Sequence, residues 1–364
     1  MQILPTSLAA GIRPRLACEL RPESVVAARA DDPAGLLATI ARAMLAPGAL
    51  VPGLRPINIV DRVAVIAAIK RVLEDLSGKS KDVTLILPDA AVRVLLLDFD
   101  SLPTKPSEAL PVVRFRLKKL LPFDADEAAV SYQIMSTSKS LVRVLAVAIP
   151  RDILEEYESA VREAGFLPGA VLPSTIAALG ALEDPATTAL LVNAGEQTIT
   201  TAIVQNSILL LHRTLEVQLP VVAAQAEAQH HIETTPVGDG LDIELPIEIS
   251  FEDPTSAQAA MQQQVLTAEI VHGAEVHALT HDLAQAVSVA AAYYEDTLSS
   301  APQEVLVGGE LGAQVIQQML HDGGFDENAL RVREIVQPAA LAAGASTSTI
   351  ARGLLAGVRG ALRT

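Results

Sequence analysis

The sequence predicts an α/β protein made of two related lobes, and three observations support this fold class. The chain has 364 residues, more than one ordinary domain contains. Half of the residues are hydrophobic but only 3% are aromatic and Trp is absent, so the core must consist of Ala, Leu, Val and Ile. Strand-like and helix-like segments alternate, and a hairpin followed by a helix occurs near the start and again from about Leu190. A duplicated α/β lobe would produce this long-range repetition.

Charge and cysteine usage narrow the possible functions. The 43 acidic residues outnumber the 27 basic ones, and the net charge of −16 argues against nucleic acid as a partner. The single cysteine, Cys18, cannot form an internal disulfide, and the N-terminal residues lack a signal-peptide pattern. No apolar run reaches the ~18 residues that a membrane span needs. We therefore expect a cytoplasmic protein.

The first lobe begins with a predicted hairpin, in which residues 15–30 form two β-prone runs around a polar turn at 21–23. Residues 31–45 predict a short helix or an extended arm, and residues 47–58 predict a loop rich in Pro and Gly. Residues 59–78 predict an amphipathic helix. Its apolar side comprises Val60, Val63, Ile66 or Ala67, Ile69 and Leu73, and Gly78 ends it.

The next segments predict a strand pair, a basic helix and a second strand pair. Residues 81–103 form two strands around a Pro-Asp turn, and residues 107–123 form a helix. The apolar side of this helix comprises Leu110, Val113, Leu117 and Leu120 or Leu121, and its basic residues are Arg114, Arg116, Lys118 and Lys119. Two strands (128–137 and 141–150) and two helices (151–166 and 174–184) follow.

The second lobe opens with residues 190–200 (LLVNAGEQTIT), a hairpin with Gly195 in its turn, and a strand at 208–219. A polar insert interrupted by Gly and Pro follows at about 220–265. The remaining predicted elements are a helix at 276–298, a strand–turn–helix at 304–325 and a final helix at 347–364. Because Gly353, Gly357 and Gly360 suit close packing, we expect this last helix to be buried and to close the lobe.

The order of these segments resembles the PilM family of type IV pilus proteins and, more distantly, FtsA and the cytoplasmic region of GspL. The resemblance rests on KDVTLILPDAAVRVLLLDFDSLP (81–103), the helix and strand of 112–135, and VLAVAIPRDILEEYESAVREAGFLPGAVLPSTIAAL (144–179). LVGGELGAQVIQQML (306–320) and STIARGLLAGVRGAL (348–362) extend it to the second lobe. It covers nearly the whole chain.

This resemblance implies an actin-like two-lobed fold of duplicated RNase H-like lobes with a small inserted subdomain of the 1C type. It implies a first lobe (1A-like) at 1–104, the 1C-like insert at 105–167, a return to the first lobe at 168–182, a second lobe at 183–340 and a closing helix at 341–364. It also implies a partner, the short N-terminal tail of a PilN-like bitopic inner-membrane protein, bound in the cleft between 1A and 1C. Membrane contact would then be indirect, through the partner. The predicted partner-binding residues are Val94, Leu96, Phe115, Arg116 and Lys119.

The resemblance further implies a cleft for ATP or ADP with Mg²⁺, in which glycine turns point backbone N–H groups at phosphates. The residues that would form it are Glu19 and Ser24 in the first hairpin, Asn193, Gly195, Gln197 and Thr198 in the second, and Gly308, Gly309 and Glu310. In the first hairpin, Arg21 occupies the position of the expected glycine, and Pro22 lacks the N–H that could donate to a phosphate. In the second hairpin, Asn193 occupies the position of the expected acid. We therefore interpret the cleft as a degenerate site with no catalytic residue, and we favour an empty relic over a site that binds ATP or ADP with Mg²⁺ without hydrolysis.

Several alternatives remain open. The chain could be an active actin-like ATPase or a sugar-kinase relative, although either would need an intact first hairpin, or an FtsA-like protein that forms filaments. A homo-oligomer is compatible with all of these. His277 and His281 have the i, i+4 spacing of metal ligands, but no Glu-x-x pattern and no cysteine accompany them, which favours a solvated or capping role. The basic helix at 107–123 could face acidic lipid, but we favour it as a wall of the partner cleft.

Overall fold

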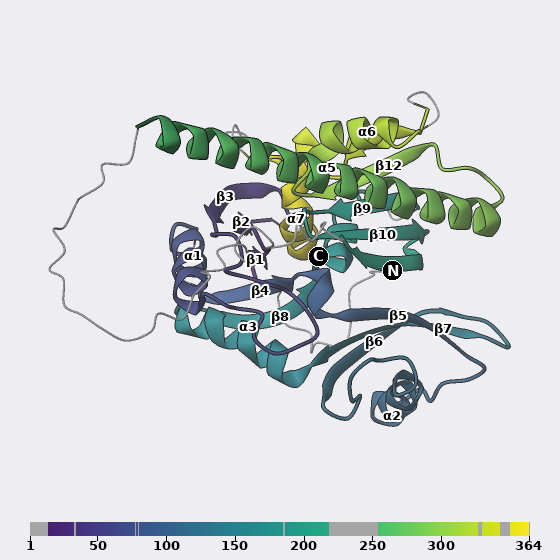
Figure 1. The fold of residues 1–364 in the computed structure, drawn as a ribbon. Coiled ribbons are helices and arrows are strands. Elements are labelled where there is room, and N and C mark those ends of the chain that lie inside the picture. The colour runs from purple at the N-terminus through teal and green to yellow at the C-terminus, as the bar shows by residue number, and fades with distance from the viewer. Residues whose placement is uncertain are drawn as a thin grey trace, which may run out of the picture.

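The computed structural model describes residues 14–363 except 33, 77, 79, 185, 218–253, 327–329 and 343–349, and only the helical backbone of 254–273. Two five-stranded sheets covered by helices form two lobes, and a three-stranded sheet forms a smaller unit beside the first lobe (Figure 1). The predicted fold class is therefore confirmed. The predicted polar insert at 220–265 lies largely outside the described residues.

The first sheet has the strand order β3-β2-β1-β4-β8. Its strands are β1 (Leu16–Leu20), β2 (Ser24–Ala30), β3 (Leu37–Met44), β4 (Asp82–Leu87) and β8 (Leu167–Pro173). β1 and β2 form the predicted hairpin, whereas β1, β4 and β8 run parallel. One face of the sheet packs on α1 (Arg62–Glu74) and α3 (Arg151–Glu163) through an apolar cluster that includes the fully buried Tyr157 and Phe166.

Two details of the first lobe differ from the sequence prediction. Residues 37–44 form a strand, so the short-helix alternative for this region is wrong, because the segment pairs with β2 along its whole length.

The apolar side of α1 is also rotated from the predicted one. Asp61 caps the helix by accepting a hydrogen bond from Ala64 N at 2.9 Å, so Val60 precedes the helix and Val63 faces solvent. The buried residues of α1 are Val65, Ala68, Ile69, Val72 and Leu73.

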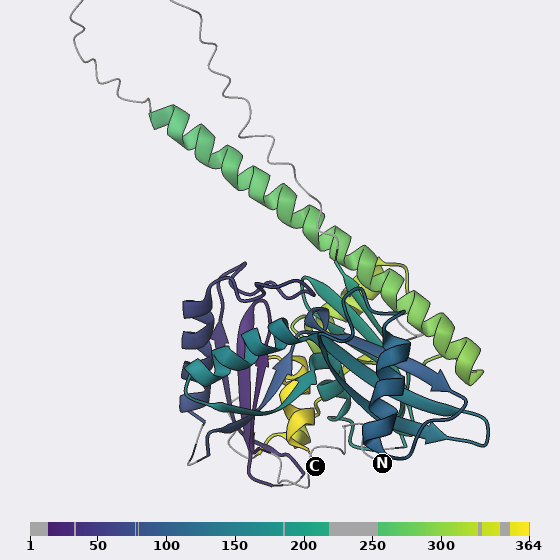
Figure 2. The same ribbon diagram turned by 90° about the horizontal axis from the view of Figure 1, so that it is seen from below.

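The second sheet has the strand order β11-β10-β9-β12-β13. Its strands are β9 (Thr188–Ala194), β10 (Thr198–Gln205), β11 (Ile208–Glu216), β12 (Glu304–Gly309) and β13 (Arg331–Glu334). The helices α5 (Pro254–Leu298) and α6 (Gly312–Asp322) pack on its outer face (Figure 1). α5 is 45 residues long, and its N-terminal part extends beyond both sheets (Figure 2).

The inner faces of the two sheets meet through α4 (Ser174–Leu179), the 3₁₀ turn η3 (Arg352–Leu355) and α7 (Ala356–Leu362), which lie between them. Every residue of α7 is buried, so the prediction of a buried closing helix is confirmed. The three glycines allow its close approach to other groups. A Cβ at Gly360 would overlap the carbonyl oxygen of Ala177, one at Gly357 would overlap the carboxylate of Glu19, and one at Gly353 would meet Glu334.

The smaller unit contains the sheet β5-β7-β6, made of β5 (Arg93–Phe99), β6 (Ala128–Thr137) and β7 (Val142–Pro150). α2 (Pro106–Leu117) covers one face through the buried Ala109, Val113 and Leu117. The predicted pair of strands at 81–103 is divided between two sheets: β4 is buried between β1 and β8, and β5 pairs with β7. The 3₁₀ turn η1 (Asp89–Ala91) carries the chain from one sheet to the other.

The predicted domain boundaries stay predictions. The three-stranded sheet takes β5 from the range 1–104, while α3, in the range 105–167, packs on α1 of the first lobe. Within the described part of the chain, no helix combines the length and the apolar character needed to cross a bilayer.

Candidate functional site

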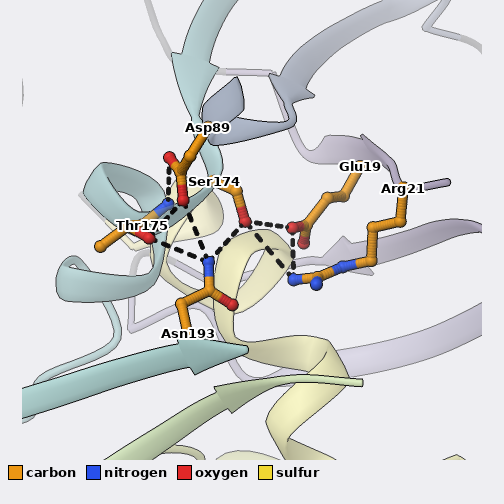
Figure 3. A network of polar contacts seen from close by, with 6 residues as sticks. All are labelled: Glu19, Arg21, Asp89, Ser174, Thr175 and Asn193. Atoms are coloured by element: carbon orange, nitrogen blue, oxygen red, sulfur yellow. Dashed lines mark hydrogen bonds and ion pairs between the residues drawn. The ribbon is translucent and has the colours of Figure 1, made fainter. Parts of the chain in front are cut away.

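Polar side chains gather where the carboxyl ends of the parallel strands meet. Glu19 lies near the end of β1 and Arg21 directly after it, Asp89 follows β4, and Ser174 and Thr175 follow β8. The second lobe brings Asn193 to the same place from the end of β9 (Figure 3). In open α/β sheets ligands bind outside the carboxyl ends of the strands, so this is the position of the predicted nucleotide cleft.

The carboxylate of Glu19 lies at the centre of this network. Its side chain is fully buried, and its Oε1 lies 2.6 Å from Arg21 Nη2 and accepts a hydrogen bond of 2.6 Å from Ser174 Oγ. Burial raises the pKa of Glu19, while the Arg21 guanidinium and the Ser174 hydroxyl oppose that rise. The guanidinium is thus the counter-ion of a carboxylate that no water reaches.

The first hairpin turn offers few backbone donors to an anion. Arg21 N donates to Ser24 O at 2.9 Å and Ser24 N donates to Arg21 O at 3.3 Å, and Pro22 has no N–H. The hydroxyl of Ser24 is buried without a hydrogen-bond partner. Two of the predicted cofactor residues, Glu19 and Ser24, therefore lie beside the cleft, but the turn between them is closed on itself.

Asn193 lies at the position where the resemblance implies an acid, but its side chain donates hydrogen bonds. Its Nδ2 donates to Ser174 Oγ at 2.9 Å, to Thr175 Oγ1 at 3.0 Å and to Asp89 Oδ2 at 3.4 Å. Asp89 also accepts hydrogen bonds from the backbone N–H of Thr175 at 3.1 Å and from its hydroxyl. An amide is suited to this position because it donates hydrogen bonds, which a carboxylate cannot do.

The remaining predicted cofactor residues line the rim of the cleft or support its wall. Gln197 and Thr198 lie at the rim with Gly195, whose N–H donates to Thr198 O at 3.0 Å within the hairpin. Gly309 has a φ of 96°, and a Cβ there would overlap the backbone of Ala194. Gly308 pairs with Asn193. Glu310 forms an ion pair with Arg42 of β3, which joins the two lobes.

The cleft that these groups form is open to solvent and has about 380 Å³ of space, part of which is open solvent. Its charged lining residues are Glu23, Asp89 and Arg21, so acids outnumber bases around it. Burial also raises the pKa of Glu23, and the neighbouring Glu196 adds to that rise. Such a lining is unfavourable for phosphate groups unless a cation accompanies them. Within the described ranges, no group of three His, Cys, Asp or Glu side chains could hold a metal ion.

A second hollow, the subdomain groove, lies between the three-stranded sheet and the first lobe. It has about 340 Å³ of space, part of which is open solvent. Its lining residues are Ser131, Tyr132, Gln133, Leu145, Val147, Val171, Leu172, Pro173 and Ile176. β8, which forms one wall, is the edge strand of the first sheet. These residues were not predicted from the sequence, although the almost continuous apolar run of β7 and the position of β8 after α3 could have indicated them.

None of the five predicted partner-binding residues lines this groove. Val94 and Leu96 of β5 pack on the cluster between the lobes, which includes Leu209. Phe115 lies on the outer side of α2, with 67% of its surface exposed, and Arg116 and Lys119 are exposed near it. The five residues thus lie on opposite faces of the small sheet, and their role in partner binding stays a prediction.

Comparison with known proteins rests on structure. No family model matches the chain, and no curated protein matches its sequence. A chain of a solved PilM-PilN type IV pilus biogenesis complex is similar over 96% of this chain and 98% of its own length, with a TM-score of 0.66 and 16% identity. The fold is that of an actin-like protein. The predicted likeness to PilM is therefore confirmed at the level of the fold.

Two other solved structures are less similar to this actin-like chain. The ethanolamine utilization protein EutJ from Carboxydothermus hydrogenoformans covers 96% of this chain and 89% of its own, with 12% identity and a TM-score of 0.44. The cytoplasmic domain of EpsL, an inner membrane component of the type II secretion system of Vibrio cholerae, covers 59% and 77%, with 13% identity and a TM-score of 0.37.

Proposed function

We propose that this protein is a PilM-like cytoplasmic scaffold of a type IV pilus or a related type II secretion machine. It would bind the short N-terminal tail of a PilN-like bitopic inner-membrane protein and so lie at the membrane through that partner. The observation that carries this proposal is the match to a chain of a PilM-PilN complex over nearly the full length of both chains.

The subdomain groove supports the choice of binding site. It lies between the small sheet and the first lobe, the place that the likeness to PilM implies for the tail. Val147, Val171 and Ile176 give it an apolar wall, and β8 ends one sheet beside it, so an extended peptide could make both apolar and backbone contacts. A tail with few charges suits this lining better than it suits the acidic surface of the rest of the chain.

The proposal includes a nucleotide cleft that has lost its ligand. Arg21 and Pro22 in the first turn, backbone N–H groups used within both hairpins and an acidic lining all disfavour phosphate binding. We therefore expect titration calorimetry with Mg-ATP to give no heat of binding. Micromolar affinity for Mg-ATP would instead support the alternative of an active actin-like ATPase.

The test of the partner proposal is a binding assay with the N-terminal peptide of the bitopic membrane protein encoded beside this gene. The native chain should bind it. The half-buried groove residues should matter most, so Val147→Lys and Val171→Lys should each weaken binding at least ~10-fold, or ~1.4 kcal/mol. The matched control, Phe115→Ser on the outer side of α2, should leave it unchanged. No binding by the native chain, or loss only in Phe115→Ser, would overturn the proposed site.

A further inference from the structure

The buried ion pair of the cleft has a role beyond the loss of nucleotide. We propose that Arg21 is a resident counter-ion that takes the place of a ligand-bound cation and, with Asn193, holds the two lobes in one arrangement when no ligand is present. The proposal deepens the nucleotide-independent scaffold proposed above and rests on it in that respect, but it does not depend on the identity of the partner.

Glu19 needs a positive charge beside it. Its carboxylate has no exposed surface, and α7 approaches it so closely that only glycine fits at position 357. An ionised carboxylate in such a place is strongly unfavourable unless it is paired and hydrogen-bonded. In a nucleotide-binding cleft a hydrated metal ion can supply that charge. Here Arg21 Nη2, from the next turn of the same hairpin, lies 2.6 Å from the carboxylate.

This pair connects with the other lobe. Arg21 Nη2 and Glu19 Oε1 both contact Ser174 Oγ, at 3.4 Å and 2.6 Å. The same oxygen accepts a hydrogen bond of 2.9 Å from Asn193, which belongs to the second sheet. One hydroxyl group therefore joins a first-lobe ion pair to a second-lobe amide, and a shift of the lobes would break the bonds of that amide to Ser174, Thr175 and Asp89.

The contacts of this network form without a ligand, although Glu19 Oε2, Arg21 Nε and Asn193 Oδ1 are buried and have no hydrogen-bond partner. The donors and acceptors of its contacts all come from the chain. The Arg42–Glu310 ion pair joins the lobes at β3, and β2 and β1 separate β3 from β4, the strand that Asp89 follows. Moving the lobes apart would leave the buried Asn193 Nδ2 without its acceptors Ser174, Thr175 and Asp89, and an unpaired buried donor costs free energy. A partner would consequently meet the same lobe arrangement whether or not nucleotide is present.

Distances between spin labels test this proposal directly. Cys18 is buried, so labels attach selectively at Arg71→Cys on α1 and Gln314→Cys on α6, two exposed positions in different lobes. We expect one narrow distance distribution that is the same with and without Mg-ATP. Adding Arg21→Met should broaden or shift it, whereas Arg162→Met, which removes an exposed ion pair with Glu155, should not.

The variants should also differ in their folding stability. Arg21→Met should lower the folded-to-unfolded ratio at least ~100-fold, because it leaves Glu19 buried and unpaired. The double variant Glu19→Gln/Arg21→Met should recover much of that loss and fold even if the single variant does not. A native distribution that changes with Mg-ATP, or a label distance unaltered in both Arg21→Met and the double variant, would overturn the proposal. Failure of the membrane-protein peptide to bind would overturn the proposed partner alone.

Discussion

The substitution Asn193→Asp separates the two interpretations of the second hairpin. If position 193 has simply lost an acid, restoring one should favour Mg-ATP. If it needs a donor, the new carboxylate would lose the hydrogen bonds to Ser174 and Thr175 and lie beside Asp89, whose Oδ2 is 3.4 Å from the present amide nitrogen. The second outcome is the one that the geometry supports.

The size of the effect follows from this distance. Two unit charges 3.4 Å apart at an effective dielectric constant of ~20 repel by about 5 kcal/mol. The site can avoid that repulsion if the new carboxyl takes up a proton. Taking a proton at pH 7 costs about 4 kcal/mol for a group with an ordinary pKa of about 3.9, and at pH 5 it costs about 1.5 kcal/mol. We therefore expect Asn193→Asp to lose about 4 kcal/mol of unfolding free energy at pH 7 and less than half of that at pH 5.

Urea unfolding at both pH values measures this loss. The control is Asn206→Asp in the exposed β10–β11 turn, where φ is 50° and Asp is well tolerated, so stability should change by less than ~0.5 kcal/mol. Two results would contradict this prediction: a loss below ~1 kcal/mol at pH 7, or micromolar Mg-ATP binding by Asn193→Asp.

Three further predictions concern stability. The pKa of Glu23 is raised in the folded chain. Its stabilising contribution is therefore present below its unfolded pKa of about 4.3 and is lost as pH rises through the folded pKa. In urea unfolding, Glu23→Gln should make the unfolding free energy fall less steeply above pH ~4.3. Gly360→Ala should cost ~2–3 kcal/mol in thermal or urea unfolding because its Cβ would overlap Ala177 O, whereas Gly53→Ala, with no atom within 4 Å, should be nearly neutral. Ile57 has a φ of 70° and is 73% exposed, so Ile57→Gly should raise unfolding free energy by about 1 kcal/mol, and a decrease would show that the strain is absent.

Local patterns predicted the elements whose formation depends on near neighbours. The two hairpins, the helices α1, α2 and α3 and the burial of α7 all followed from turn residues, apolar spacing and glycines. β3 was ambiguous, because LATIARAM contains good helix formers and becomes a strand only by pairing with β2. The division of residues 81–103 between two sheets depends on contacts that no local pattern contains.

The candidate site was predictable in its location but not in its chemistry. Glu19, Asn193 and Gly308 were found through family spacing, whereas Asp89 and Ser174 were missed. The signal for these two was their position directly after strands that turn out to be parallel, since carboxyl ends of parallel strands meet at one edge. The hydrogen bonds to Ser174 and Thr175 across the cleft orient the amide of Asn193, so the sequence of the hairpin alone could not predict its orientation.

The contacts that join the lobes also set the order in which the chain can fold. Arg42 and Glu310 are 268 positions apart, and Arg359 donates to the carbonyl of Gly35 across 324 positions. Closing loops of this length costs conformational entropy before the contacts compensate, and folding slows as contacting residues lie further apart in sequence. The hairpins β1–β2 and β9–β10 should therefore form early, and the core around α7 should form in a late and slow phase. Until then the inner faces of both sheets stay exposed, which makes this interval the one in which the chain is most prone to aggregate.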